Sequence, residues 1–128
     1  MCPSANGQTS AAEQDSRLTL RETEWAYIAG ILDGEGSISY YQRKNRPSGF
    51  WTIEIANTNL DLIHLLEWRL GYGFVCERTH HDTRHKRAWY FFIRQKVGMV
   101  HFLQGVMPYL VVKKENAWKA LEWAGKVA

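Results

Sequence analysis

The chain has 128 residues, 45% of them hydrophobic, and a formal net charge of +3. This composition predicts one globular domain and excludes a disordered or fibrous protein. The apolar run from Trp25 to Leu32 is too short to span a bilayer, which needs roughly 20 residues. The first residues lack the basic start and apolar run of a secretory signal, and Cys2 and Cys76 cannot form a disulfide framework. We therefore expect a reduced intracellular protein, in a bacterial cytoplasm or nucleoid or in an organelle.

Residues 1–17 are small, polar and non-periodic, which predicts a disordered arm before a single domain at 18–128. Thr19 and Glu22 form a capping-box pattern, which predicts the start of a helix. Apolar residues then follow at helical spacing, and Gly34 and Gly36 end the helix.

From residue 37 the apolar period changes to two. Residues 37–44 and 50–57 predict a hairpin, and 57–73 predict a helix capped by Asn57 or Asn59 and ended by Gly71. Residues 74–81 and 87–95 predict a second hairpin. A short helix at 97–105, a break at Pro108 and a last helix at 112–126 complete the chain. The order predicts an α+β fold, and the six tryptophans lie at core-like periods.

The first helix carries small residues on one face. Ala26, Gly30 and Gly34 recur every four positions, with Ala29 beside them. Such faces let two helix backbones approach closely, and glycine inside a helix otherwise costs about 1 kcal/mol relative to alanine. One explanation is a two-fold dimer in which this helix contacts its copy. The alternative is that Gly30 packs under the chain's own second helix.

Asp33 and Glu35 lie at the C-terminal end of this helix, where the helix dipole disfavours acids. In a two-fold dimer the two Glu35 side chains would meet and repel each other. A divalent cation such as Mg²⁺ would remove that repulsion, because carboxylates are its preferred protein ligands. The alternative is that both acids are ordinary turn residues that face water.

The stretch IAGILDGEG at 28–36 resembles the motif of the LAGLIDADG homing endonucleases. Residues 53–73 and the segment MPYLVVKKENA at 107–117 are similar to later parts of that family, so the resemblance covers roughly residues 18 to 125. It implies an αββαββα unit with a saddle-shaped antiparallel sheet. It also implies a homodimer through the motif helices.

The same resemblance implies a site-specific double-strand DNA endonuclease, encoded in an intron. Such an enzyme uses Mg²⁺, with Mn²⁺ as a substitute, and leaves short 3′ overhangs at a long pseudo-palindromic target. It implies that Glu35 and Gly34 bind the metal, that Lys113 lies near the scissile phosphate and that Asn57 organises the attacking water. Asp33 would support the helix ends. The main alternative is a non-cleaving member such as an intron-splicing maturase, and a remoter one is a plain helix-mediated dimerisation domain.

Strand alternation predicts a polar, basic and aromatic face that would read double-stranded DNA. Its expected members are Ser39, Tyr41, Arg43, Thr52, Glu54, Cys76, Arg78, His80, Tyr90, Phe92 and Arg94. Loop residues are expected to hold phosphates, namely Lys44, Arg46, Arg84, Lys86 and Arg87. The plain alternative is a solvated sheet face. Membrane and small-molecule partners are not expected, and His80, His81 and His85 lack the paired spacing of a zinc site.

Overall fold

The computed structural model describes residues 19–78 and 87–125. Helix α2 (Glu22–Glu35) runs into strand β1 (Gly36–Gln42), which is followed by β2 (Gly49–Asn57) and helix α3 (Leu60–Leu70). Strands β3 (Phe74–Arg78) and β4 (Ala88–Ile93) come next. Helix α4 (Lys96–Val106), the 3₁₀ turn η1 (Met107–Tyr109) and helix α5 (Lys114–Gly125) end the described chain. The α+β order is confirmed, and the expected arm at 1–17 lies outside the described residues.

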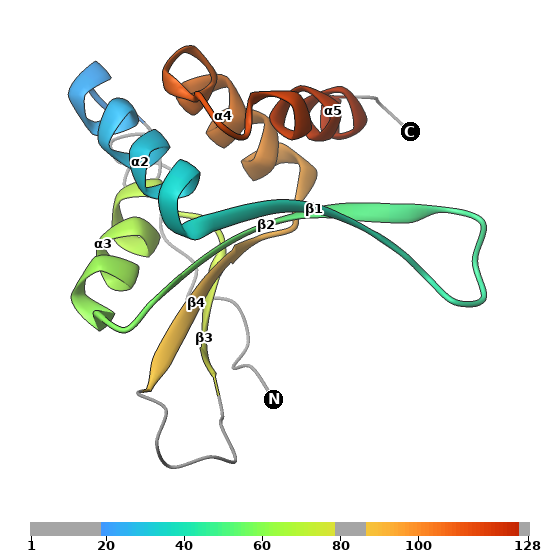
Figure 1. Cartoon of the computed structure of the whole chain (residues 1–128), viewed down its shortest axis with the longest axis horizontal. Helices are drawn as coiled ribbons and strands as arrows, with labels where there is room; N and C mark the ends of the chain where they lie inside the picture. The colour runs from blue at the N-terminus through green and yellow to red at the C-terminus, as the bar shows by residue number, and fades with distance from the viewer. Residues whose placement is uncertain (1–18, 79–86, 126–128) are drawn as a thin grey trace.

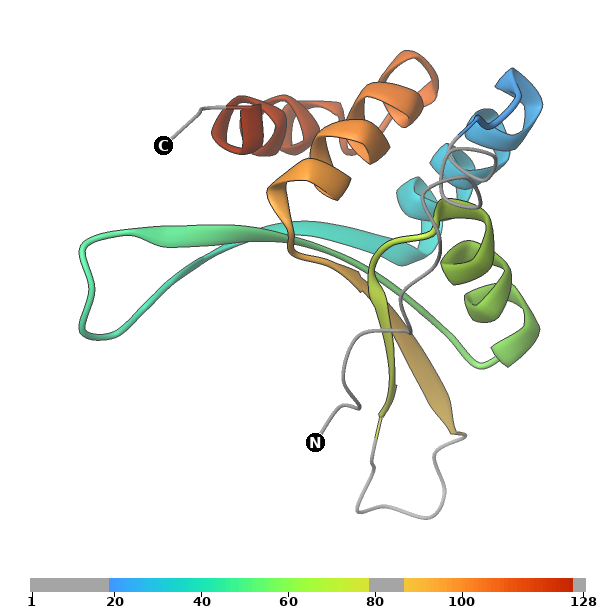
Figure 2. The ribbon, with the colours of Figure 1, turned by 180° about the vertical axis from the view of Figure 1, so that it is seen from behind.

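The four strands form one antiparallel sheet in the order β1-β2-β4-β3. The four helices lie on one side of this sheet, and the β1–β2 hairpin extends beyond them (Figure 1). The sheet curves so strongly that its two hairpins point in different directions, as the view from behind also shows (Figure 2). No helix of the described residues covers the opposite face, which we call the lower face. None of these helices combines the length and apolar character needed to cross a membrane.

The core lies between the upper face of the sheet and the helices. Ile38, Ile53, Ile55 and Phe91 point from the strands into this layer and are at most 3% exposed. They alternate with residues of the lower face, as the period of two predicts. The expectation that all six tryptophans are core residues is wrong, because Trp68 and Trp118 are 60% and 57% exposed.

The start of one helix differs from that expected, and the cap of another is one of the two residues expected for it. Helix α2 starts after Arg21 rather than Thr19, because the Glu24 carboxylate accepts the Arg21 backbone N–H at 3.1 Å. Helix α3 is capped by Asn59, whose Oδ1 accepts the Leu62 N–H at 3.2 Å, which leaves Asn57 for another contact. Gly71 ends α3 with a φ of 76°, as expected for a left-handed cap.

The Asp33 carboxylate joins the end of α2 to the start of α5. It accepts the backbone N–H groups of Val111, Val112 and Lys113 at 2.8, 3.1 and 3.1 Å. The ammonium of Lys113 donates to the Asp33 carbonyl at 2.7 Å. A negative charge is favourable before a helix N-terminus and a positive charge after a C-terminus, so both side chains lie at a suitable helix pole. This contact explains an acid in the last turn of α2 without invoking a metal.

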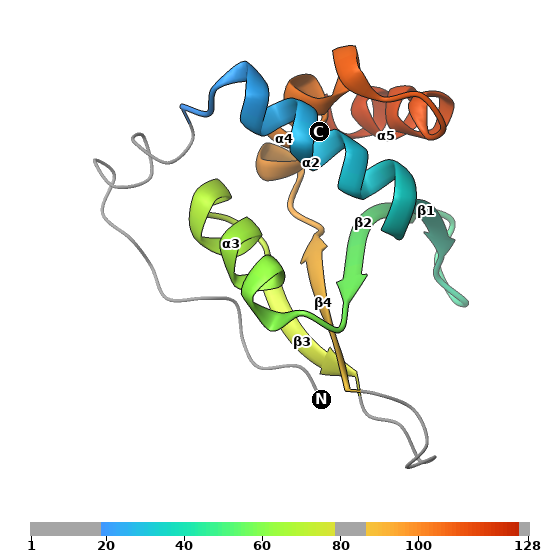
Figure 3. The same ribbon diagram turned by 60° about the vertical axis from the view of Figure 1, so that its left-hand side comes forward.

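An ion pair holds α2 against α3, which lie side by side in Figure 3. The Arg69 guanidinium donates to both carboxylate oxygens of Glu24, at 2.7 and 2.9 Å. The two side chains are 21% and 23% exposed. Chiefly because of these hydrogen bonds from Arg69, the pKa of Glu24 is lowered from 4.5 to about 2.

Replacing the Asp33 carboxylate should loosen the start of α5. We expect Asp33→Asn to lower the free energy of unfolding by about 1.5–3 kcal/mol, since hydrogen bonds to a charged group are lost. Urea unfolding measures this loss, and amide exchange at residues 111–113 should speed up. Asp61→Asn is the control, because exposed Asp61 in the first turn of α3 contributes only a few tenths of a kcal/mol. Equal losses in the two variants would contradict the role of Asp33.

The Glu24–Arg69 pair should make stability depend on acid pH. Because the folded-state pKa of Glu24 is lowered, its contribution is fully present above the unfolded value of 4.5. It should disappear as the pH falls from 4.5 toward 2. The difference in unfolding free energy between wild type and Glu24→Gln is therefore constant above pH 4.5 and shrinks below it. A difference that does not change over this range would show that Arg69 does not stabilise the ionised form.

Candidate functional site

The last turn of α2 ends in a hydrogen-bonded network that includes Glu35. Nδ2 of Asn57 donates to Oε2 of the exposed Glu35 carboxylate. Oδ1 of Asn57 accepts the Asn59 N–H at 2.7 Å, and Asn59 in turn caps α3. Since Oδ1 is occupied by a backbone donor, the amide must present its NH₂ to Glu35. Asn57 therefore holds one carboxylate oxygen of Glu35 and leaves the other free to face outward.

A second predicted catalytic residue, Lys113, also contacts the end of α2. Lys113, at the start of α5, reaches the Asp33 carbonyl of α2, two residues before Glu35. Glu35, Asn57 and Lys113 come from three distant parts of the chain. The Asp33 contact holds Lys113 at this helix end, whereas Asn57 reaches Glu35 from the end of β2. The structure thus gathers the predicted catalytic residues around one turn of one helix.

This helix end offers ligands suited to a hard divalent cation. Glu35 supplies a carboxylate, and a helix end also presents backbone carbonyl oxygens, among which the Gly34 carbonyl is the expected ligand. Within residues 19–78 and 87–125, no group of three His, Cys, Asp or Glu side chains could hold a metal by itself. The Glu35 carboxylate and the Gly34 carbonyl are donors of the kind that Mg²⁺ binds.

The outward face of α2 is open at both motif glycines. Gly30 and Gly34 are exposed, and a Cβ added to either would meet no atom within 4 Å. The alternative in which Gly30 packs under the second helix is therefore wrong. Ala26 is half-buried, but Ala29 is 0% exposed and belongs to the chain's own core, so its assignment to a dimer face is also wrong.

Exposed apolar side chains of α2 and α3 lie on one side of this open face. Tyr27, on the same side of α2, is 58% exposed, and Leu65 and Trp68 of α3 are 45% and 60% exposed. A shallow groove between α2 and α3, lined by Tyr27, Leu65 and Asn57 among others, reaches the Glu35 network. Neither Tyr27 nor α3 was predicted from the sequence to belong to this surface. Helical spacing from Gly30 and Gly34 would have found Tyr27.

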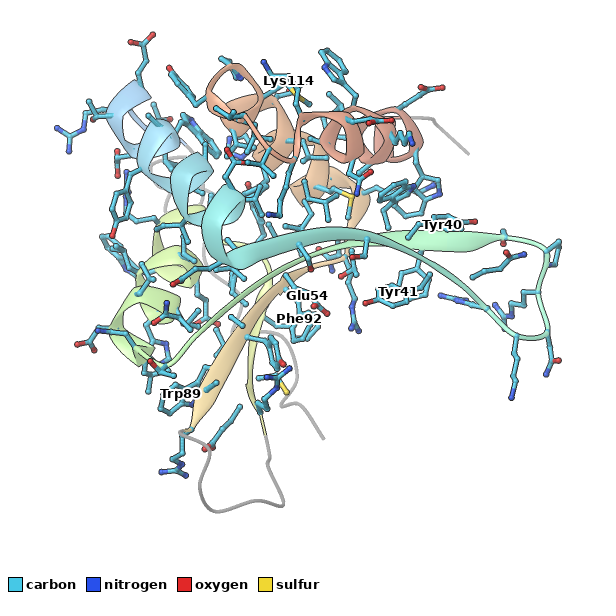
Figure 4. All side chains as sticks on the ribbon, viewed as in Figure 1. Tyr40, Tyr41, Glu54, Trp89, Phe92 and Lys114 are labelled. Atoms are coloured by element: carbon cyan, nitrogen blue, oxygen red, sulfur yellow. The ribbon has the colours of Figure 1, made fainter. Side chains whose placement is uncertain are left out.

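The lower face of the sheet carries the residues that alternation predicted. The register pairs Ser39 with Thr52, Glu54 with Phe92, and Cys76 with Tyr90, so these side chains share one face. Tyr41, Glu54 and Phe92 point below the sheet, whereas Tyr40 points to the helical side (Figure 4). Figure 4 also labels Trp89, near the start of β4, and Lys114, which lies in the helical layer at the first turn of α5.

Several members of this predicted face differ from expectation. Thr52 and Phe92 are 0% and 7% exposed, so they support neighbouring side chains rather than offer free surface. Cys76 is not a free thiol, contrary to the reduced state expected for it. Arg87 forms an ion pair with Glu77 at 2.6 Å, which offsets part of its charge. Arg43, Lys44, Arg46 and Arg78 are exposed, while His80, Arg84 and Lys86 lie outside the described residues.

The exposed arginines of the lower face lie over aromatic rings. The guanidinium carbon of Arg43 is 5.3 Å from the Phe50 ring centre, and that of Arg78 is 4.7 Å from the Tyr90 ring centre. Arg94 lies over both Phe92 and Phe74, at 4.9 and 5.4 Å. Such stacking orients a guanidinium without using its N–H donors. Phe50 and Phe74 were missed in the sequence, although alternation from Ile53 and Val75 places neither on the core face.

No protein-family model matches the sequence, and no curated protein matches it. Solved structures do match. The archaeal intron-encoded homing endonuclease I-Vdi141I, complexed with DNA, has a TM-score of 0.68 and 20% identity, over 81% of this chain and 68% of that chain. The homing endonuclease I-CvuI, in complex with the I-CreI target, has a TM-score of 0.66 and 20% identity, over 82% and 68% of the two chains.

The structure of the LAGLIDADG homing endonuclease I-GzeII, also in complex with its DNA target, is similar over a smaller part of its own length. Its TM-score is 0.62 with 21% identity, and the match covers 77% of this chain but only 34% of that one. At these identities the similarity establishes the fold. The chain has the LAGLIDADG homing endonuclease fold, which the motif at residues 28–36 predicted.

Proposed function

We propose that this protein is a dimeric, site-specific double-strand DNA endonuclease that uses divalent metal ions. The observation that carries the proposal is the grouping of Glu35, Asn57 and Lys113 around the last turn of α2. A carboxylate can hold a metal ion, an amide can orient that carboxylate, and an ammonium can stabilise the charge on a phosphate, so this group of side chains suits metal-assisted phosphodiester hydrolysis. The similar structures of I-Vdi141I, I-CvuI and I-GzeII contain DNA, which supports DNA as the substrate.

The dimer forms through the open face of α2. Gly30 and Gly34 leave room for a second helix, and exposed Tyr27 and Leu65 add apolar area beside it. Two copies of α2 crossing here would bring the two Glu35 carboxylates together. Their repulsion favours a bound cation, and the cation in turn stabilises the dimer on DNA.

Glu35 would bind Mg²⁺, or Mn²⁺ in its place, together with the Gly34 carbonyl. One I-CvuI complex was studied with Mg and another with Ca, which is consistent with a divalent ion in this fold. When bound, the metal would polarise the scissile phosphate and lower the pKa of a bound water. The protein needs no covalent nucleophile for this reaction.

The chain's own residues position these groups. Asn57 holds one oxygen of Glu35, so that the other faces the metal. Lys113 adds a fixed positive charge beside the phosphate, and its ammonium is held at the end of α2 by the Asp33 carbonyl. Asp33 fixes the backbone of residues 111–113, which keeps Lys113 in place.

The lower face of the sheet reads the DNA. Its exposed arginines, together with Tyr41 and Glu54, would contact base edges in the major groove, while Lys44 and Arg46 hold phosphates near the hairpin turn. Two copies related by a two-fold axis would recognise a long pseudo-palindromic target and cut both strands, leaving short 3′ overhangs. We also infer an intron-encoded origin and a bacterial or organellar location from the fold.

Removing the charge of Glu35 should separate binding from cleavage. We expect Glu35→Gln to bind a selected DNA target as wild type does and to lose cleavage. Asn57→Ala should lower the cleavage rate by about 10- to 100-fold, since groups that orient a metal ligand have effects of this size. Gel-based cleavage assays with magnesium measure both rates.

Glu115→Gln is the matched control, because Glu115 lies on α5 and pairs with Lys119. It should cleave at the wild-type rate. Cleavage by Glu35→Gln in metal-controlled buffer would contradict the proposed role of Glu35. A wild-type protein that binds nucleic acid without cutting, and that stimulates intron splicing, would instead identify a maturase.

A bulky residue at Gly30 should disrupt the dimer without unfolding the chain. Because no atom lies within 4 Å of an added Cβ, Gly30→Leu should keep or raise the stability of the dilute single chain, by about 0.5–1 kcal/mol. Association should weaken by about tenfold or more, since overpacked contacts cost 1–3 kcal/mol. Sedimentation equilibrium measures this change. Gly125→Ala, at another open glycine on α5, should leave association unaltered; equal association of both variants would place the interface elsewhere.

A further inference from the structure

The side chain of Arg94 is held by two stacked aromatic rings on the lower face. Phe74 and Phe92 have ring centres 5.1 Å apart and planes 25° from parallel. The guanidinium carbon of Arg94 lies 4.9 Å from one ring centre and 5.4 Å from the other. Among the stacked arginines described above, Arg43 and Arg78 each have one ring, so Arg94 is the most constrained.

Gly73 allows the two rings to lie against each other. Its φ of +87° is unfavourable for other residues, and a Cβ there would lie 2.7 Å from both the Phe91 Cζ and the Phe92 carbonyl oxygen. Glycine therefore lets β3 begin close against β4. The register then places Phe74 directly opposite Phe92, and because paired residues share a face, both side chains lie on the lower face.

The stacked arrangement leaves the donors of Arg94 available. A guanidinium carries its five N–H groups in its plane, so stacking on a ring face does not consume them. Arg94 is exposed, and none of the ion pairs within residues 19–78 and 87–125 includes it. Glu54, opposite Phe92 in the register, is likewise absent from those pairs, so the nearby acid does not neutralise Arg94.

The location favours a base over a phosphate. Arg94 directly follows β4, which lies between β2 and β3 in the sheet, whereas Arg43 and Arg46 lie at the end of the β1–β2 hairpin. A planar, preoriented pair of donors matches the O6 and N7 acceptors of guanine in the major groove. A phosphate can also accept two donors from a guanidinium, so it is the place of Arg94 beside the middle of the sheet, away from the hairpin turn, that favours a base.

We propose that Arg94 reads one guanine in each half of the DNA target, and that Phe74 is a positioning residue that acts through Arg94. This inference rests on the proposed DNA-binding function and assigns a chemical preference to one position of the target. In a two-fold dimer the preference appears twice, at positions related by the symmetry of the site.

The first experiment defines the target and its tolerance. The wild-type chain selects duplexes from a randomised pseudo-palindromic library, and binding to each single-base substitution of the selected sequence is then measured. Wild type should discriminate by about 5- to 100-fold against replacement of a guanine at two symmetry-related positions. Arg94→Lys keeps the charge, so the salt dependence and non-specific affinity should persist while this discrimination disappears.

The second experiment is a double-mutant cycle on target binding. Phe74→Leu keeps apolar bulk but removes the ring, and should weaken binding by about two- to fivefold with the loss confined to the Arg94 positions. In the Arg94→Ala background it should have no further effect. Phe74→Tyr restores a ring and should restore the preference. Phe50→Leu, under Arg43, is the matched control and should be additive with Arg94→Ala.

The outcomes separate the two proposals. A wild type that selects no DNA sequence would overturn this inference and the proposed function together. Specific binding in which Arg94→Lys alters no single position would overturn the base-reading role alone. Additive effects of Phe74→Leu and Arg94→Ala, or losses spread evenly over the target, would show that Phe74 has only a structural role.

Discussion

An acid in the last turn of a helix is unfavourable by itself, and Asp33 is stable there because three backbone N–H groups before α5 donate to it. This contact brings together parts of the chain that are about 80 residues apart. It places Lys113 at the helix end that carries Glu35, while Asn57 approaches from the end of β2. The position of Lys113 beside Glu35 therefore depends on one carboxylate that we do not expect to touch the substrate.

Two exposed surfaces of the molecule differ in chemistry: the open face of α2 is apolar, and the lower face of the sheet is basic and aromatic. The helical layer buries the core and leaves one face of α2 open at Gly30 and Gly34, beside exposed Tyr27 and Leu65. The lower face of the sheet carries arginines that aromatic rings hold in place. An open apolar face next to an exposed carboxylate is explained if a second copy covers it. In that assembly the two reading surfaces would form one continuous saddle along DNA.

Much of the fold could be predicted because its signals are local. Alternation gave both hairpins and the correct face for Tyr41, Glu54 and Phe92, and Gly71 marked the end of α3. The failures need long-range information. Ala29 could not be told from its small neighbours, because which side of α2 meets the core depends on elements that come later in the chain. The Glu24–Arg69 pair and the Phe74–Phe92 stack likewise depend on packing between segments, and Thr52 is buried by neighbours that alternation does not identify.

The most direct test of the two-copy account is native mass spectrometry of the full chain with a selected duplex and calcium. The account predicts two chains on each duplex, together with bound divalent ions that are lost in Glu35→Gln while both chains remain. A duplex saturated by a single chain, or ion binding that does not depend on Glu35, would contradict it.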